Sequence, residues 1–251
     1  MPQPHIVHCS YHKCLTVYYG RVMHGLFNRV MRWGPGYRHY NSHLQDFYQG
    51  FSSHRVASVN NRVLDLDQFE DFRISRFVRD PRDLVVSGYF YHRRGAEPWT
   101  NLQSPTQDDW YFANGVIPEG MCGTELSFAE YLQTLPVEEG LLAELEFRRS
   151  HFQSMAEWPK QHRNIVLYRY EDILGNERRV WRDLFEFYGM PPLERTIGHW
   201  FARRYAAASL SSHPHVRNPV SGQWREHFTP RVRRAFDAEY AGLLRELGYP
   251  T

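Results

Sequence analysis

Several features that would define particular protein classes are scarce or missing in this sequence of 251 residues. It has only three cysteines, Cys9, Cys14 and Cys122, too few for a disulfide framework, which favours a reducing compartment. A membrane-spanning helix needs about 20 apolar residues in a row, and no apolar run in the sequence approaches that length. Membrane insertion is therefore not expected. The N-terminus lacks a signal-peptide pattern, because His8 interrupts the short apolar run before it. These absences predict a cytoplasmic protein.

A strong excess of positive charge is also missing. The formal net charge is +2, whereas proteins that bind nucleic acids are usually strongly basic, so we expect no nucleic-acid partner. Histidine is plentiful, with 14 residues, but the nearest pairs, His8/His12 and His213/His215, lack the cysteine or carboxylate spacing of a zinc site. We therefore expect no metal.

The length, the composition and the apolar patterns suit one α/β domain or two small ones. Apolar residues make up 42% and charged residues 23% of the chain, as in a globular protein. Short apolar runs predict strands over residues 5–9, 37–41, 55–59, 74–78 and 164–168. Apolar residues at helical spacing predict helices over residues 18–31, 128–135, 141–158, 176–188 and 193–208. This order is typical of an α/β fold with buried parallel strands.

The stretch from Phe72 to Arg94 combines a strand, a tight turn at Asp80-Pro81 and a helix that starts near Asp83. Asp83 suits the positive end of the helix dipole. Arg79 lies where the strand ends, and Ser87 lies one helical turn beyond Asp83. A guanidinium and a hydroxyl in these places can bind one anion at the sheet edge where α/β proteins bind ligands.

A second strand, loop and helix unit occupies the first part of the chain. The loop contains Lys13, and Thr16 can add a hydroxyl near the start of the following helix. This arrangement presents backbone N–H groups and a helix N-terminus to a phosphate. The loop is not a Walker motif, because G-x-x-x-x-G-K-[ST] is absent.

Together these segments resemble the sulfotransferase family. R-D-P-R-D-L-V-V-S (79–87) is similar to the segment that binds the 3′-phosphate of PAPS (3′-phosphoadenosine-5′-phosphosulfate). Y-H-K-C-L-T-V-Y (11–18) is similar to the 5′-phosphosulfate loop, in which Tyr-Pro-Lys-Ser-Gly-Thr-Thr-Trp is typical. Leu15 stands in place of the glycine, and Leu resists positive φ. Near the C-terminus, five residues match the family's third segment: Arg217, Gly222, Trp224, Phe228 and Thr229.

The resemblance implies a single domain over residues 1–251 with a P-loop-like fold, a three-layer α/β sandwich in which helices flank a central parallel sheet. It also implies that the protein uses PAPS as co-substrate, releases PAP and needs no metal. It implies that Lys13 is catalytic, because its ammonium group stabilises the leaving phosphate, while Arg79, Ser87 and Arg217 hold the 3′-phosphate. The implied cofactor-binding residues are Lys13, Cys14, Leu15, Thr16, Val17, Arg79, Ser87, Phe152, Ser209, Arg217 and Asn218.

The general base is less clear from the resemblance. Cytosolic family members carry a histidine on the strand before the 3′-phosphate segment, where this chain has Asn60 and Asn61. By analogy with other branches of the family, our first candidate is His43, in the loop after the second strand. Three other residues rank behind it as candidates: His54, Asp46 and His92. An acceptor acidic enough to ionise unaided would need no base.

Residues 93–125 show no clear periodicity and are rich in aromatic residues and proline, so we predict a lid or acceptor-site wall there. An apolar pocket would suit a small molecule such as a phenol or lipid alcohol, and a sugar stacked on Trp99 or Trp110 is equally compatible. Two other functions stay open: a catalytically silent protein that binds PAP or PAPS, and a P-loop kinase, which the missing Walker motif disfavours. The oligomeric state also stays open.

Overall fold

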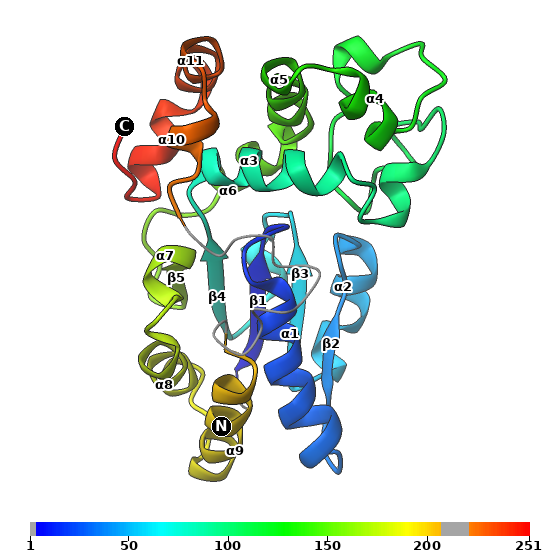
Figure 1. Cartoon of the computed structure of the whole chain (residues 1–251). Helices are drawn as coiled ribbons and strands as arrows, with labels where there is room; N and C mark the ends of the chain where they lie inside the picture. The colour runs from blue at the N-terminus through cyan, green and yellow to red at the C-terminus, as the bar shows by residue number, and fades with distance from the viewer. Residues whose placement is uncertain (1–3, 207–220) are drawn as a thin grey trace. The chain divides into compact units, whose positions relative to one another are not determined.

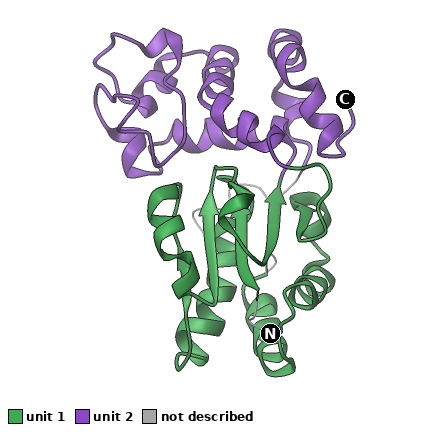
Figure 2. Ribbon diagram, turned by 180° about the vertical axis from the view of Figure 1, so that it is seen from behind, with its two compact units in different colours: residues 1–78, 159–220 green, residues 79–158, 221–251 purple. Residues whose placement is uncertain are grey.

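The structure is a computed structural model that describes residues 4–206 and 221–251 (Figure 1). The chain divides into two compact units, the first comprising residues 1–78 and 159–220 and the second residues 79–158 and 221–251 (Figure 2). Ser209, Arg217 and Asn218, three of the predicted cofactor-binding residues, lie outside the described residues.

The first unit is built on a parallel sheet with the strand order β2-β3-β1-β4-β5. The strands are β1 (His5–Ser10), β2 (Tyr37–His39), β3 (Val56–Asn60), β4 (Phe72–Val78) and β5 (Ile165–Arg169). All four neighbouring pairs are parallel. The predicted strands are therefore confirmed within a residue or two, and all five carboxyl ends meet at one edge of the sheet.

Three helices cover one face of this sheet: α1 (Thr16–His24), α8 (Glu177–Phe187) and α9 (Pro192–Arg204). α1 continues directly into a π-helix, η1 (Gly25–Val30), so the predicted helix over 18–31 has two forms. A Cβ at Gly25 would lie 2.6 Å from the Phe201 ring, so glycine lets η1 approach α9 closely. Tyr19, Trp181 and their apolar neighbours form the core between this helix layer and the sheet.

Aromatic side chains cover the opposite face. Phe47 of α2 (Leu44–Gly50) stacks on Phe51 of the 3₁₀ turn η2 (Phe51–Ser53), with ring centroids 5.3 Å apart. Phe51 lies 4.9 Å from Phe69, which follows the turn η3 (Leu66–Gln68) and contacts Phe72 of β4. Helices on both faces confirm the three-layer prediction, although α2 lies where the sequence pattern indicated only a loop. The short helix α7 (Tyr170–Ile173) follows β5.

The second unit is helical. Its helices are α3 (Pro81–His92), α4 (Phe128–Thr134), α5 (Val137–Phe147), α6 (Arg149–Ala156), α10 (Trp224–His227) and α11 (Pro230–Glu246). Thr229 caps α11, because its hydroxyl accepts from the N–H of Val232. The single helix predicted over 141–158 is wrong: α5 ends before Arg148, whose buried side chain bonds back to Glu144 at 2.8 Å.

Residues 93–125 carry two 3₁₀ turns, η4 (Pro98–Asn101) and η5 (Glu119–Met121), and contribute to the core of the second unit. Trp110 is fully buried and Trp99 is 8% exposed; both pack against Phe128 and Phe147. The prediction that a sugar could stack on Trp99 or Trp110 is therefore wrong, because neighbouring rings already cover these indoles. Among the described residues, no helix is long and apolar enough to span a membrane.

A row of polar side chains crosses the α1-facing side of the sheet. His8 is aligned with Ser58 on β3 and with Ser75 on β4, and its Nδ1 lies 2.7 Å from Ser75 Oγ. The His8 ring stacks on Tyr19, with centroids 3.5 Å apart. Burial, followed by the nearby His39, holds the pKa of His8 well below its ordinary value. A neutral imidazole is therefore built into the core.

We expect His8 to make the stability depend on pH. The unfolded chain binds a proton at this residue below about pH 6.5, whereas the folded chain does so only at much lower pH. This contribution is therefore present above about pH 6.5 and is lost at up to about 1.4 kcal/mol per pH unit as the pH falls. Urea unfolding between pH 7.5 and pH 5 measures it.

The variant His8→Phe removes this titration, so its unfolding free energy should fall less steeply with decreasing pH than that of the wild type. The control variant, His24→Phe, changes an exposed residue of α1 and should keep the wild-type slope. Equal slopes in His8→Phe and wild type would contradict the assignment.

Candidate functional site

The loop between β1 and α1 contains two residues in the left-handed backbone conformation. Lys13 has φ 73° and Leu15 has φ 62°, although neither is glycine. This conformation costs about 1–2 kcal/mol for a residue with a Cβ. Leu15 therefore takes up the conformation that it was expected to resist, and the loop keeps the turn that glycine would allow.

Hydrogen bonds within the first unit hold this loop in place. The N–H of His12 donates to Asn61 Oδ1 at 2.8 Å, and the N–H of Asn61 donates to the Ser10 carbonyl at 2.9 Å. The N–H of Cys14 closes a turn on the Tyr11 carbonyl at 2.9 Å. The asparagines that replace the family histidine thus fasten the loop to β3, which offsets the strain of the two left-handed residues.

The helix α1 begins directly after this loop. Leu15 is the N-cap, no side chain caps it, and the first turn has no acidic residue. The first N–H groups of a helix have no partner inside the helix, and they carry partial positive charge. Thr16 and Val17 contribute such groups, and Lys13 precedes them. This helix start suits a phosphate or sulfate group. Cys14 is fully buried and its N–H is used on the Tyr11 carbonyl. The cofactor-binding role of Lys13, Cys14, Leu15, Thr16 and Val17 stays a prediction.

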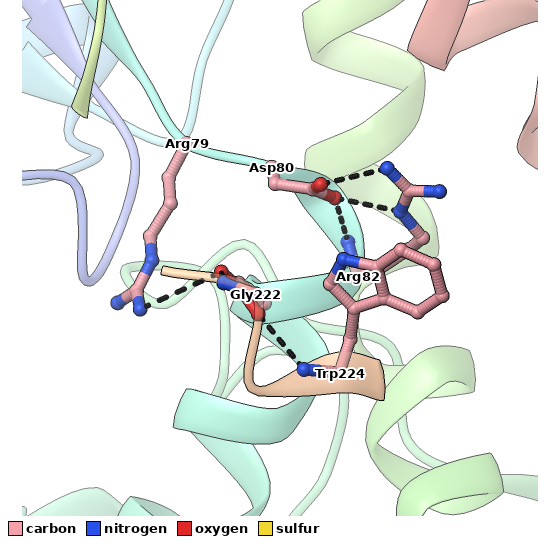
Figure 3. A network of polar contacts seen from close by, with 6 residues as sticks. Arg79, Asp80, Arg82, Gly222 and Trp224 are labelled. Carbon is pink, nitrogen blue, oxygen red and sulfur yellow. Dashed lines mark hydrogen bonds and ion pairs between the residues drawn. The ribbon is translucent and has the colours of Figure 1, made fainter. Parts of the chain in front are cut away.

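The start of α3 carries a second cationic group. Asp80 caps the helix by accepting from the N–H of Arg82 at 2.9 Å. Pro81 is the first helical residue, so α3 begins two residues before the predicted start near Asp83. The Asp80 carboxylate also accepts two hydrogen bonds from the Arg82 guanidinium, at 3.0 and 2.8 Å. The Arg82 guanidinium is thereby held close to the start of α3. The side chain of Arg79, the residue before Asp80, extends in a different direction (Figure 3).

Asp83 connects α3 to the C-terminal segment. The residue is 1% exposed, and its carboxylate accepts from the N–H of Gly222 at 2.6 Å and from the N–H of Trp224 at 3.0 Å. Gly222 has φ 85°, which places its N–H for this contact without strain. The Arg79 guanidinium lies 4.0 Å from the same carboxylate. Asp83 therefore joins two of the three motifs, whereas the sequence suggested only a helix-dipole role.

One more contact joins these two motifs. Arg82 stacks on the Trp224 ring, with its Cζ 3.9 Å from the centroid. Ser87 is half-buried and lies four residues after Asp83, hence on the same side of α3 as the carboxylate that faces Arg79. The binding of one anion by Arg79 and Ser87 together stays a prediction.

Phe152 lies in the interior of the second unit. It is 1% exposed, and its ring packs edge-on against Tyr240 at 4.9 Å and against Phe236 at 6.1 Å. Its role beside adenine stays a prediction, which the interior position does not favour.

The candidates for a general base lie in different environments. His43 is exposed and precedes α2, and Asp46 is exposed in the first turn of that helix. His54 is half-buried, and burial, with Arg38, lowers its pKa. His92 is fully buried, with its Nδ1 2.7 Å from Glu144 Oε2, so it cannot reach an acceptor.

The structure adds a histidine that the sequence interpretation missed. His39, at the carboxyl end of β2, has its Nε2 3.3 Å from Asn60 Nδ2 and its Nδ1 2.8 Å from Ser58 Oγ. Burial lowers the pKa of His39 to about 4, against a smaller opposite effect of a hydrogen bond with Asn41. Among the described residues, no group of three or more histidine, cysteine, aspartate or glutamate side chains could hold a metal ion.

Comparison with known proteins decides the family. Residues 4–248 match the sulfotransferase domain, which is nearly the whole chain. The chain belongs to the sulfotransferase family. The sulfotransferase resemblance predicted from the three motifs is therefore confirmed.

Solved sulfotransferase-type structures share the fold. Mouse sulfotransferase SULT7A1 complexed with PAP superposes with a TM-score of 0.55 at 18% identity, over 98% of this chain and 86% of that one. Retinol dehydratase in complex with androsterone and the inactive cofactor PAP gives a TM-score of 0.54 at 15% identity, over 100% of this chain and 84% of that one. At these identities the likeness supports the predicted P-loop-like fold.

We expect the variant Asp83→Ala to be strongly destabilised. It removes the acceptor of two backbone N–H groups and leaves the buried Arg79 guanidinium without this nearby carboxylate. Breaking a buried charged contact of this kind typically costs about 3–5 kcal/mol, which urea unfolding would measure.

The matched control is Asp237→Ala, which removes an exposed carboxylate 3.5 Å from Arg233 on α11. Its unfolding free energy should stay within about 1 kcal/mol of the wild type. A variant Asp83→Ala as stable as this control would show that Asp83 does not hold the C-terminal segment.

Proposed function

We propose that this protein is an enzyme that transfers the sulfuryl group of PAPS to a hydroxyl group of a small-molecule acceptor. The bond between sulfur and the bridging phosphate oxygen breaks, and a bond forms between sulfur and the acceptor oxygen. PAP leaves, and the hydroxyl proton passes to a base or to water. The observation that carries this proposal is the left-handed loop with Lys13 at the uncapped start of α1, in a chain of this family.

The first unit would bind the phosphosulfate end of PAPS. The N–H groups of Thr16 and Val17, at the positive end of α1, suit its negative oxygens. Lys13 supplies a compact positive charge close by. The chain has 30 basic residues, of which only Lys13 and Lys160 are lysines, so the binding loop contains one of two lysines. A point charge of this type suits a phosphate oxygen on which charge develops.

Arg79 and Ser87 would bind the 3′-phosphate, with Arg217 and Asn218 assigned there by resemblance. The Arg79 guanidinium is 4% exposed, and Asp83 fixes it on one side without forming a close bidentate pair at 4.0 Å. A guanidinium already held by its surroundings loses little conformational entropy when it binds a phosphate. The PAP in the complexes of SULT7A1 and retinol dehydratase supports this choice of nucleotide.

The acceptor would contact residues 93–125. Three apolar side chains of this segment are exposed: Leu102 by 42%, Tyr111 by 48% and Phe112 by 37%. Retinol dehydratase has been crystallised with androsterone and with retinol, both small apolar alcohols, which supports a similar acceptor class. His43, exposed before α2, stays our candidate for the base.

Transfer of radiolabelled sulfate from PAPS to a panel of phenols and apolar alcohols tests the proposal. The variant Lys13→Ala should lower kcat about a hundredfold to a thousandfold, because it removes a preorganised positive charge at the leaving oxygen. Arg79→Ala should mainly raise the KM for PAPS, because it acts on binding away from the reacting sulfur.

Lys160→Ala is the matched control and should keep wild-type kinetics. If the wild type binds PAP but transfers no sulfate to any acceptor, the protein is a silent PAP-binding member of the family. If Arg79→Ala lowers kcat while Lys13→Ala only raises KM, the two roles are wrongly assigned.

A further inference from the structure

Six polar side chains form a continuous row at the carboxyl edge of the sheet in the first unit. In spatial order they are Tyr37, Ser58, His39, Asn60, Ser10 and Thr16. The strand register explains the row, because His39 is paired with Ser58, and Ser10 is paired with Asn60. The row starts on the edge strand β2 and ends at the first residue of α1, in the loop proposed to bind phosphosulfate.

Hydrogen-bonding capacity sets the direction of this row at its first end. The Tyr37 hydroxyl is buried, and within the described part of the chain its one hydrogen-bond partner is Ser58 Oγ, at 2.7 Å. Leaving a buried hydroxyl hydrogen unused is unfavourable, so Tyr37 donates to Ser58. Ser58 then uses its own hydrogen on His39 Nδ1, 2.8 Å away.

This direction fixes the form of the imidazole. If Nδ1 accepts from Ser58, a neutral His39 carries its hydrogen on Nε2. Burial keeps the pKa of His39 at about 4, so the ring is neutral at pH 7.

The Nε2 hydrogen in turn decides which way the Asn60 amide faces. Nε2 lies 3.3 Å from one end of this amide, and Ser10 Oγ lies 3.1 Å from the other. An N–H facing the amide nitrogen would put two donors together, so the amide oxygen belongs on the His39 side and its NH₂ group on the Ser10 side. Turning the amide by 180° exchanges these ends without changing its shape.

The last step concerns Thr16. With the Asn60 NH₂ group donating to Ser10, the Ser10 hydroxyl donates to Thr16 Oγ1, 2.8 Å away. The Thr16 hydrogen can then go to the Tyr11 carbonyl, at 3.2 Å, or to a phosphate oxygen. With the amide in the opposite orientation, Ser10 donates to Asn60 and its oxygen is open to the Thr16 hydrogen, so that Ser10 competes with the phosphate for this hydrogen.

We propose that His39 is a positioning residue of the phosphosulfate loop. Its Nε2 hydrogen orients the Asn60 amide and the Ser10 hydroxyl, so that the Thr16 hydroxyl can donate to the 5′-phosphate. This inference rests on the proposed function, because that function places the phosphate at Thr16.

Two variants at position 39 separate this role from simple packing. Glutamine places an amide N–H near the position of Nε2, whereas asparagine offers a group near Nδ1 only. The Kd of His39→Gln for PAP should lie within about threefold of the wild-type value. His39→Asn should bind PAP about tenfold more weakly, as expected when the hydrogen bond from Thr16 to the charged phosphate is lost. If contact with Ser58 alone mattered, His39→Asn would be the better substitute.

A double-mutant cycle with Thr16→Val tests the connection. Thr16→Val alone should weaken PAP binding at least tenfold by calorimetry. The double variant His39→Asn, Thr16→Val should bind no more weakly than Thr16→Val, because both changes remove the same hydrogen bond. Losses that simply add would overturn the inference. His24→Asn, on the exposed side of α1, is the control and should bind as the wild type does.

Nitrogen NMR of the wild-type His39 ring tests the same inference without any variant and without PAP. At pH 7 we expect a hydrogen on Nε2 and a bare Nδ1; a hydrogen on Nδ1 would overturn the inference. If the wild type binds PAP but the losses of affinity in the double-mutant cycle simply add, only the role of His39 is overturned. Absence of PAP binding by the wild type would overturn the proposed function, and this inference with it.

Discussion

The chain leaves β1 through two left-handed residues, Lys13 and Leu15, and the chemistry that we propose depends on this constraint. A straighter connection would direct the first N–H groups of α1 away from the loop. The conformation is unfavourable for residues with a Cβ, and it persists because Asn61 and the turn at Tyr11 hold the loop from both sides. The residues that replace the family's basic histidine have therefore acquired a structural task. A base, where one is needed, has to come from another element.

A buried carboxylate plays the corresponding part in the second unit. Asp83 binds the backbone at Gly222 and Trp224 and lies beside Arg79. One side chain therefore fixes both the start of the C-terminal helices and the arginine that we propose binds the 3′-phosphate. Charged contacts of this kind add little net stability, because desolvation offsets the attraction, but they specify one arrangement. We infer that this contact serves to fix the position of the Arg79 guanidinium and not to add stability. Both units thus position cations and N–H groups by hydrogen bonds to side chains that do not themselves meet the substrate.

Much of the fold could be predicted from the sequence, because buried parallel strands are continuous apolar runs and the amphipathic helices repeat with helical spacing. Features that depend on distant partners could not. The pattern assigned Asp83 to the helix dipole, since its true partner Gly222 is 139 residues away. His39 was overlooked, because its contacts follow from the adjacency of β2 and β3, which no local pattern specifies. The break at Arg148 depends on a buried ion pair, and the burial of Trp110 cannot be read from an aromatic-rich composition.

The central claim is that a doubly phosphorylated adenosine binds to the groups assigned here, and a crystal structure of the protein with PAP tests it most directly. The account predicts the 5′-phosphate within hydrogen-bonding distance of the N–H groups of Thr16 and Val17 and of Lys13 Nζ, and the 3′-phosphate on Arg79 and Ser87. Crystals grown at millimolar PAP that hold no nucleotide, or that hold its phosphates on other residues, would contradict it.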